Sequence, residues 1–182
     1  MRVFEMDGHS SPLGDLGRYR IETNRSKLET DTDFFACPDC GATGVTGFGQ
    51  HHDGVRLLWS QSTRCTECDC SIEADDIGFP PDAIRRHLIA SSGRWGLLVE
   101  TSGPDRLKAC KILHCDLETT LEEVKRMKDR MPGIVYTGTK CEIEWLRKRL
   151  QSFGFSALVI PCGHELNAVS IDLSTRLQRA SV

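Results

Sequence analysis

Apolar positions along the chain follow regular patterns from about residue 80 onward and only weak patterns before it. Apolar residues at helical spacing predict four helices, over about 83–91, 104–114, 121–131 and 140–153. Short continuous apolar runs predict three buried strands, over 95–101, 134–137 and 155–160. After its first helix, the second half of the chain is therefore predicted to run β-α-α-β-α-β.

Cap residues support these boundaries. Thr119 or Thr120 can cap the third predicted helix, whose first turn is acidic and whose later turns are basic, as the helix dipole favours. Gly138-Thr139 is expected to cap the fourth helix, and Gly154 is expected to end it. Weaker alternation favours two additional strands, over 17–23 and 168–173.

The first half of the chain holds one clear hairpin signal. Asp53-Gly54 lies between two strand-like runs, 47–52 and 55–60. This dipeptide is typical of two-residue hairpin turns, because Gly tolerates a positive φ. The sequence therefore predicts a two-residue turn with His51 and His52 at the tip, where exposed loop histidines are the simplest interpretation.

Four of the nine cysteines form two Cys-x-x-Cys pairs, Cys37 with Cys40 and Cys65 with Cys68, and 24 residues separate the pairs. The first residues carry no apolar core of signal-peptide type, and no stretch reaches the roughly 20 apolar residues of a membrane helix. We therefore expect a cytoplasmic protein. In a reducing compartment, an odd number of cysteines in this arrangement favours metal ligands over disulfides.

Two such pairs can place four thiolates in a tetrahedron around one Zn²⁺ ion. We therefore predict a zinc ribbon over residues 31–78, with a single structural zinc as its cofactor. Structural zinc contributes roughly 10–16 kcal/mol in small peptides at neutral pH, and so short a segment has little core of its own. Four thiolates leave no position for water, which argues against a catalytic zinc. Cys70, two residues beyond Cys68, is an alternative ligand.

Charge is distributed unevenly, although the net charge of the whole chain is only −3. Residues 31–76 contain nine acidic and two basic side chains, whereas residues 80–182 contain 16 basic and 12 acidic ones. The acidic segment suits a protein partner with a basic face. The candidate partner-binding residues are Asp39, Asp53, Glu67, Asp69 and Glu73. Nucleic acid is less favoured because phosphate binding requires local positive charge, and neither a membrane nor a small-molecule substrate is expected.

Residues 121–125 read Leu-Glu-Glu-Val-Lys, and residues 131–138 read Met-Pro-Gly-Ile-Val-Tyr-Thr-Gly. Together with the following helix and closing strand, they make residues 95–161 similar to the C-terminal domain of the bacterial ribosomal stalk protein. That family shares its fold with the adaptor of the Clp protease, so the resemblance implies a two-layer fold. It does not imply the ribosomal role, because Glu122 stands where the family has a lysine on its factor-binding helix. The two cysteine pairs resemble the zinc-ribbon superfamily.

The predicted fold class is α+β, with a hairpin-rich, four-cysteine zinc ribbon followed by a two-layer β-α-α-β-α-β domain. The predicted segments are an N-terminal segment with one strand at most, the ribbon, a linker helix, and an α/β domain with a tail, over 1–30, 31–78, 79–93 and 94–182.

For function, we expect a non-enzymatic protein-binding module, for example a bacterial immunity or inhibitor protein that masks a toxin through its acidic surface. One alternative is a nucleic-acid- or ribosome-associated zinc-ribbon factor that uses the basic C-terminal helices. Another is an enzyme with Cys162 as its nucleophile and His164 as its base.

Overall fold

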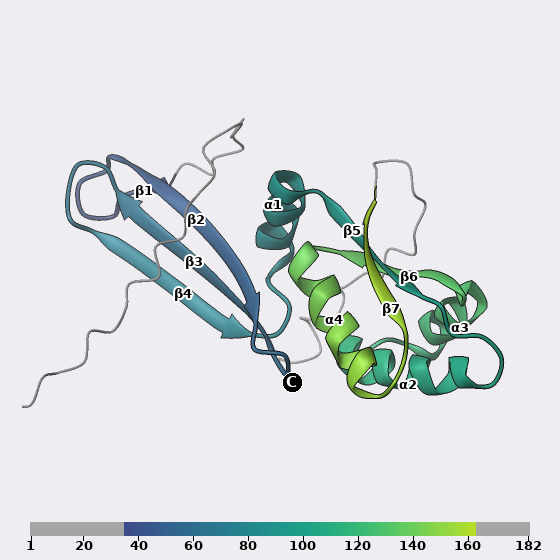
Figure 1. Cartoon of the computed structure of the whole chain (residues 1–182). Coiled ribbons are helices and arrows are strands. Elements are labelled where there is room, and N and C mark those ends of the chain that lie inside the picture. The colour runs from purple at the N-terminus through teal and green to yellow at the C-terminus, as the bar shows by residue number, and fades with distance from the viewer. Residues whose placement is uncertain (1–34, 163–182) are drawn as a thin grey trace, which may run out of the picture.

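The computed structural model describes residues 35–162, which form two antiparallel sheets and four helices (Figure 1). The first sheet has the strand order β1-β2-β3-β4, with β1 Phe35–Ala36, β2 Thr43–His52, β3 Leu57–Cys65 and β4 Ser71–Ile77. The second sheet has the order β6-β5-β7, with β5 Arg94–Val99, β6 Gly133–Gly138 and β7 Ala157–Cys162. The helices are α1 Asp82–Ser92, α2 Asp105–Leu117, α3 Leu121–Arg130 and α4 Lys140–Ser152.

The second half confirms the predicted α+β class and the predicted β-α-α-β-α-β order, which the chain follows from β5 to β7. α3 packs on β6, α4 packs on β5 and β7, and α2 packs on both of these helices. Their apolar faces meet the sheet in one core cluster, which includes Leu97, Leu113, Met127, Tyr136, Leu146 and Leu150. Burial of these side chains stabilises this half of the molecule.

Two capping boxes fix the starts of α3 and α4. At α3 the N-cap is Thr120, whose hydroxyl accepts from the Glu123 N–H while the Glu123 carboxylate accepts from the Thr120 N–H. Thr139 and Glu142 repeat this exchange at α4. Each box satisfies backbone donors that a helix start leaves without partners. Thr139 belongs to the predicted cap Gly138-Thr139, and Thr120 is one of the two candidates predicted for α3.

The predicted two-residue hairpin turn is wrong. β2 and β3 are joined by the four residues 53–56, and His52 pairs with Leu57. The Asp53 carboxylate accepts the backbone N–H groups of Val55 at 2.8 Å and Arg56 at 2.6 Å, and it forms an ion pair with the Arg56 side chain. The Asp53 side chain thus closes a four-residue loop, although Asp-Gly on its own favours a two-residue turn. His51 and His52 end β2 and do not form the tip.

Strand β4 is an element that the apolar pattern does not predict. Its sequence, Ser-Ile-Glu-Ala-Asp-Asp-Ile, contains no continuous apolar run. All seven residues are exposed, so neither face of the strand is buried. Its backbone pairs with β3 from Ser71 opposite Arg64 to Ile77 opposite Leu58. β4 is the last strand in the order of the sheet, and it leaves one edge without a neighbour among the described residues.

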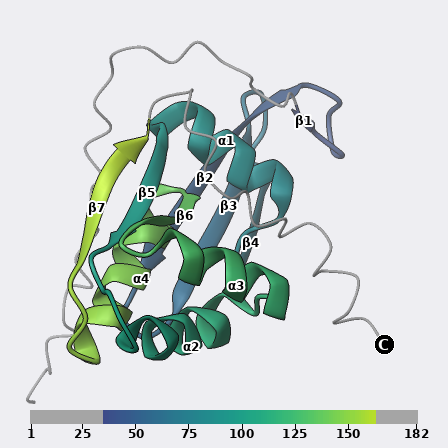
Figure 2. The ribbon, with the colours of Figure 1, turned by 90° about the vertical axis from the view of Figure 1, so that its right-hand side faces the viewer.

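Helix α1 joins the two halves and lies between them, with the β2–β3 hairpin behind it in the second view (Figure 2). Its Arg85 reaches the fully buried Glu142 of α4, with Nε 2.8 Å from Oε1 and Nη2 2.8 Å from Oε2. Tyr136 donates its hydroxyl to the same carboxylate at 3.0 Å, and burial raises the pKa of this tyrosine so that it stays protonated. A Cβ on Gly138 would collide with Glu142, so this glycine makes room for the cluster.

Within residues 35–162, no helix is long and apolar enough to cross a bilayer. Four expectations lie outside the described residues: the strand over 17–23, the strand over 168–173, the N-terminal segment 1–30 and the base His164.

Candidate metal centre

Two backbone turns hold the four paired cysteines at one end of the first sheet. The Cys37 N–H donates to the Ala42 carbonyl at 2.8 Å, and the Cys65 N–H donates to the Cys70 carbonyl at 2.9 Å. Each turn is thus closed by the same bond, from its first cysteine to the carbonyl five residues later. The first turn leads from β1 into β2 and the second from β3 into β4, and the pairing of Gly44 in β2 with Cys65 in β3 brings the turns together.

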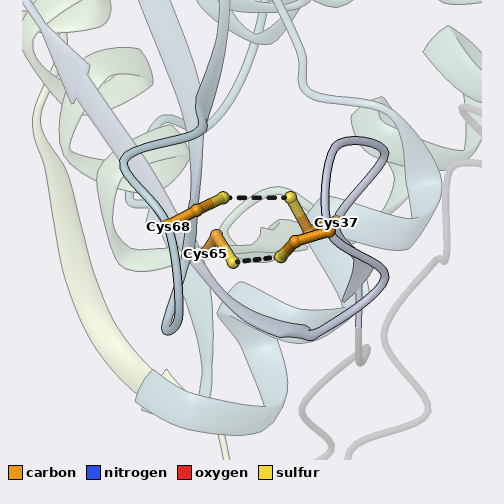
Figure 3. A group of neighbouring side chains, drawn as sticks. Cys37, Cys65 and Cys68 are labelled. Carbon is orange, nitrogen blue, oxygen red and sulfur yellow. Dashed lines mark hydrogen bonds between the residues drawn. The ribbon is translucent and has the colours of Figure 1, made fainter.

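The four sulfurs lie within 4.8 Å of one another, and no other set of four is grouped in this way in the described chain. Figure 3 shows the sulfurs of the two turns facing each other, with Cys37 Sγ 3.6 Å from Cys68 Sγ. Cys40 Sγ lies 3.5 Å from Cys65 Sγ. A tetrahedral ion with metal–sulfur bonds of about 2.3 Å requires sulfurs about 3.8 Å apart. The cluster therefore needs little adjustment to hold one metal ion.

Backbone N–H groups stabilise thiolates at the first cysteine of each turn. The Cys40 N–H, followed by that of Asp39, lowers the pKa of Cys37 to about 6, although burial opposes this. The N–H groups of Glu67 and Cys68 lower the pKa of Cys65 in the same way. Glu67 N lies 3.4 Å from Cys65 Sγ. Both sites are thus prepared for the deprotonated form that binds metal.

The second cysteine of each turn shows the opposite effect. The Ala42 N–H lowers the pKa of Cys40, but Cys65 and burial outweigh it and raise the pKa overall. At Cys68 the Cys70 N–H is likewise outweighed by Cys65 and Cys37, and the pKa rises to about 12. Four thiolates this close repel one another, so complete ionisation requires a cation between them.

Cys70 lies beside the four-cysteine cluster. Its sulfur, Cys37 Sγ and a carboxylate oxygen of Asp39 form a second group of potential ligands within 4.8 Å. Burial raises the pKa of Cys70 to about 11, and the sulfur of Cys37 contributes to this rise. The four paired sulfurs already form a complete set of four without Cys70. The geometry nevertheless keeps Cys70 available as the alternative ligand that the sequence suggests.

The predicted partner-binding acids do not form one patch. Asp39, Glu67 and Asp69 are exposed in the two cysteine turns, and Glu73 is exposed on β4. Asp53 lies at the opposite end of the β2–β3 hairpin, where Arg56 pairs with it. Two further carboxylates lie on β4: Asp75 is on the same face as Glu73, and Asp76 is on the opposite face. Both residues are among the nine acids counted in residues 31–76. The sequence predicts no strand over this segment, however, so it does not indicate which of its acids lie near one another.

The structure does not favour Cys162 as a nucleophile. Its side chain is buried, and its sulfur packs where a Cβ on Gly96 would stand. Burial raises the pKa of this thiol, which disfavours the reactive thiolate.

Comparison of the chain with protein-family models, with curated proteins and with solved structures gives no match. The resemblance to the ribosomal stalk domain therefore rests on the residues quoted above and on the order of elements, and it stays a prediction. The cysteine cluster is compatible with a zinc ribbon.

Proposed function

We propose that this chain is a cytoplasmic, non-enzymatic protein-binding module, in which one structural zinc holds an acidic sheet that binds a basic partner. Zinc is the favoured metal because four thiolates in a closed tetrahedron are typical of structural zinc sites. A reducing compartment suits the nine cysteines, all of which are free.

The observation that carries the proposal is the edge strand β4. Its seven residues are all exposed, and they include Glu73, Asp75 and Asp76 without one basic residue. An unpaired strand edge can accept an extended segment of another protein through backbone hydrogen bonds. Carboxylates along the edge select for basic segments and accelerate their association.

The neighbouring strands leave these carboxylates accessible. Glu73 pairs with Ser62 and Asp75 with Ser60, and these serines pair in turn with Gly47 and Gly49. Because side chains alternate between the two faces of a strand, all six lie on one face. The four residues beside the acids carry small side chains or none. Neither Glu73 nor Asp75 belongs to an ion pair within the described residues.

An immunity protein that masks a toxin is one form of this proposal. A toxin that acts on nucleic acid needs a basic active site, and an acidic strand edge can compete for such a surface.

The proposal is tested by capture from the source cell's lysate, with the zinc-loaded protein as bait and nuclease added. We expect one stoichiometric protein partner, which the double variant Glu73→Lys/Asp75→Lys loses. The matched control is Glu122→Lys/Asp129→Lys, which reverses two exposed charges on α3 and should retain the partner.

Two results would contradict the proposal. One is equal capture by both double variants, which would place the binding surface elsewhere. The other is recovery of ribosomal proteins or RNA that nuclease removes, which would favour the basic C-terminal helices and a nucleic-acid-associated role.

A further inference from the structure

The open edge of β4 presents a defined set of backbone groups (Figure 1). In an antiparallel pair, residues whose N–H and C=O groups point at the partner strand alternate with residues whose groups point away from it. Two bonds fix this alternation for β4. The Cys65 N–H donates to the Cys70 carbonyl at 2.9 Å at one end, and the Gly78 N–H donates to the Leu57 carbonyl at 2.7 Å at the other.

The register between these two bonds is continuous, so the even-numbered residues of β4 point their N–H and C=O groups at β3. The odd-numbered residues point theirs toward the open edge, and they are Ser71, Glu73, Asp75 and Ile77. A strand added to this edge therefore bonds to these residues and to no others of β4.

The open stretch is short. Asp76 Oδ1 accepts from the Ile77 N–H at 2.7 Å, so a side chain already occupies the backbone donor at this end of the edge. At the other end β4 begins at Ser71, directly after the second cysteine turn. The edge is thus open over residues 71–75, and a segment that binds there is correspondingly short.

Both acids in this stretch lie where the backbone is unpaired. Glu73 and Asp75 point their N–H and C=O groups toward the edge, and their side chains lie exposed on the same face. An added antiparallel strand forms hydrogen-bonded pairs with these two residues, and the side chains within each pair are neighbours on that face. Residues two apart in the added strand therefore meet the two carboxylates, and Lys or Arg is favoured at both positions.

The residue between these two meets the other face of β4. On that face the Ile72 side chain is 45% exposed, and the exposed Ala74 follows it. The middle residue of the added segment lies opposite Ala74 and diagonal to Ile72. An apolar side chain at this position covers carbon surface that water otherwise contacts.

A second copy of β4 does not suit this edge. Antiparallel pairing of two copies over residues 71–75 would place the two Glu73 carboxylates opposite each other. Like charges directly opposite one another destabilise a strand pair. The occupant must therefore bring basic residues from a different segment.

We infer that the open edge of β4 binds, as an added antiparallel strand, an extended segment of another protein in which two basic residues flank one apolar residue. This inference rests on the proposed function and names the spacing that the partner must present.

The test is a titration of the full-length, zinc-loaded protein with the synthetic peptide Gly-Thr-Arg-Val-Arg-Thr-Gly, followed by NMR hydrogen exchange. At saturation the amides of Glu73 and Asp75 should exchange more slowly, because they gain acceptors. The amides of Ile72 and Ala74 point at β3 and should change little.

Two methylated peptides separate backbone pairing from charge. N-methylation of both arginines removes the donors for the Glu73 and Asp75 carbonyls and should weaken binding by about tenfold or more. N-methylation of the valine removes an N–H that points away from β4, so the affinity should change less than about threefold. All three peptides carry the same charge.

Three further comparisons test the spacing and the site. A peptide with adjacent arginines, Gly-Thr-Arg-Arg-Val-Thr-Gly, should bind about threefold more weakly or worse. Glu73→Lys/Asp75→Lys should lose the Arg-Val-Arg peptide and bind Gly-Thr-Glu-Val-Glu-Thr-Gly instead, which also shows that the edge is still formed. The α3 variant Glu122→Lys/Asp129→Lys should behave as the unchanged protein.

Three results would overturn the inference: no saturable binding of the Arg-Val-Arg peptide, equal affinity of the two methylated peptides, or slowed exchange that avoids Glu73 and Asp75. If lysate capture still depends on these acids when the peptide fails, the proposed function stands without strand addition. If the peptide binds as expected and capture fails, the edge recognises this spacing and the proposed function is the part that is wrong.

Discussion

The two sheets of this molecule are stabilised by different means. Among residues 35–162 the core cluster contains 16 buried residues, and Leu57 is the one member that comes from the first sheet. Besides Leu57, the buried hydrophobic residues of that sheet and its turns are the cysteines Cys37 and Cys65. The second half thus obtains its stability from apolar burial, whereas the first has, in place of a core, a cluster of four cysteines that could hold a metal ion.

The first sheet is anchored at both ends. The cysteine turns hold one end of the β2–β3 hairpin, and Leu57 at the other end enters the core of the second half. Near Leu57, the Trp145 indole donates to the Val55 carbonyl at 3.1 Å. Between these anchors the sheet is rich in glycine and serine and buries little.

The largest expected effect is that of removing the metal. Chelation, or the substitution Cys65→Ser, should unfold the first sheet, because roughly 10–16 kcal/mol of binding free energy is lost and no apolar core replaces it. The second half should keep its fold. Amide NMR spectra report both halves separately, and metal analysis should give one zinc per chain before chelation.

Cys115→Ser is the matched control for this prediction, since Cys115 is an exposed thiol on α2 outside the cluster. It should retain the zinc and the spectrum. If the first sheet keeps its amide dispersion without metal, the first sheet does not depend on metal for its fold, and the two halves are not stabilised by different means.

The next largest effect concerns the junction between α1 and the second half. Arg85→Leu leaves the Glu142 carboxylate buried without its cation, which costs about 3–5 kcal/mol. Urea unfolding followed by circular dichroism should show this loss in the transition of the second half. Arg86→Leu changes an exposed neighbour on the same helix and should cost far less. Equal losses in the two variants would mean that the buried Arg85–Glu142 pair stabilises the fold no more than an exposed arginine does.

The smallest effect concerns the anchor near Leu57. Trp145→Phe removes one hydrogen bond to the Val55 carbonyl, which contributes about 0.5–1.5 kcal/mol to the free energy of unfolding, and the void left by the smaller buried ring adds to this loss. Hydrogen exchange of the 53–56 loop should increase at the same time. Trp59→Phe is the control, because no indole hydrogen bond of Trp59 occurs within the described residues. A change at Trp59 as large as that at Trp145 would argue against this anchor.

Features that depend on local spacing were predictable from the sequence. The order of elements from β5 to β7 follows from apolar periodicity, and the Thr139 cap follows from the residues that begin α4. The cysteine cluster was equally predictable, since each Cys-x-x-Cys turn depends only on its own few residues.

Features that depend on distant contacts were not predictable. β4 is held by pairing with β3 and has no buried face, so no apolar pattern marks it. The Arg85–Glu142 pair joins residues 57 positions apart.

The position of β7 in the second sheet has a consequence for synthesis on the ribosome. β5 is the central strand and pairs with both β6 and β7, and β7 ends at Cys162, 85 residues after Ile77 closes the first sheet. At about 5–20 residues per second, these residues take roughly 4–17 s to add. During this interval the cysteine turns of the nascent chain can already bind a metal ion, while apolar β5 still lacks its last neighbour and remains exposed.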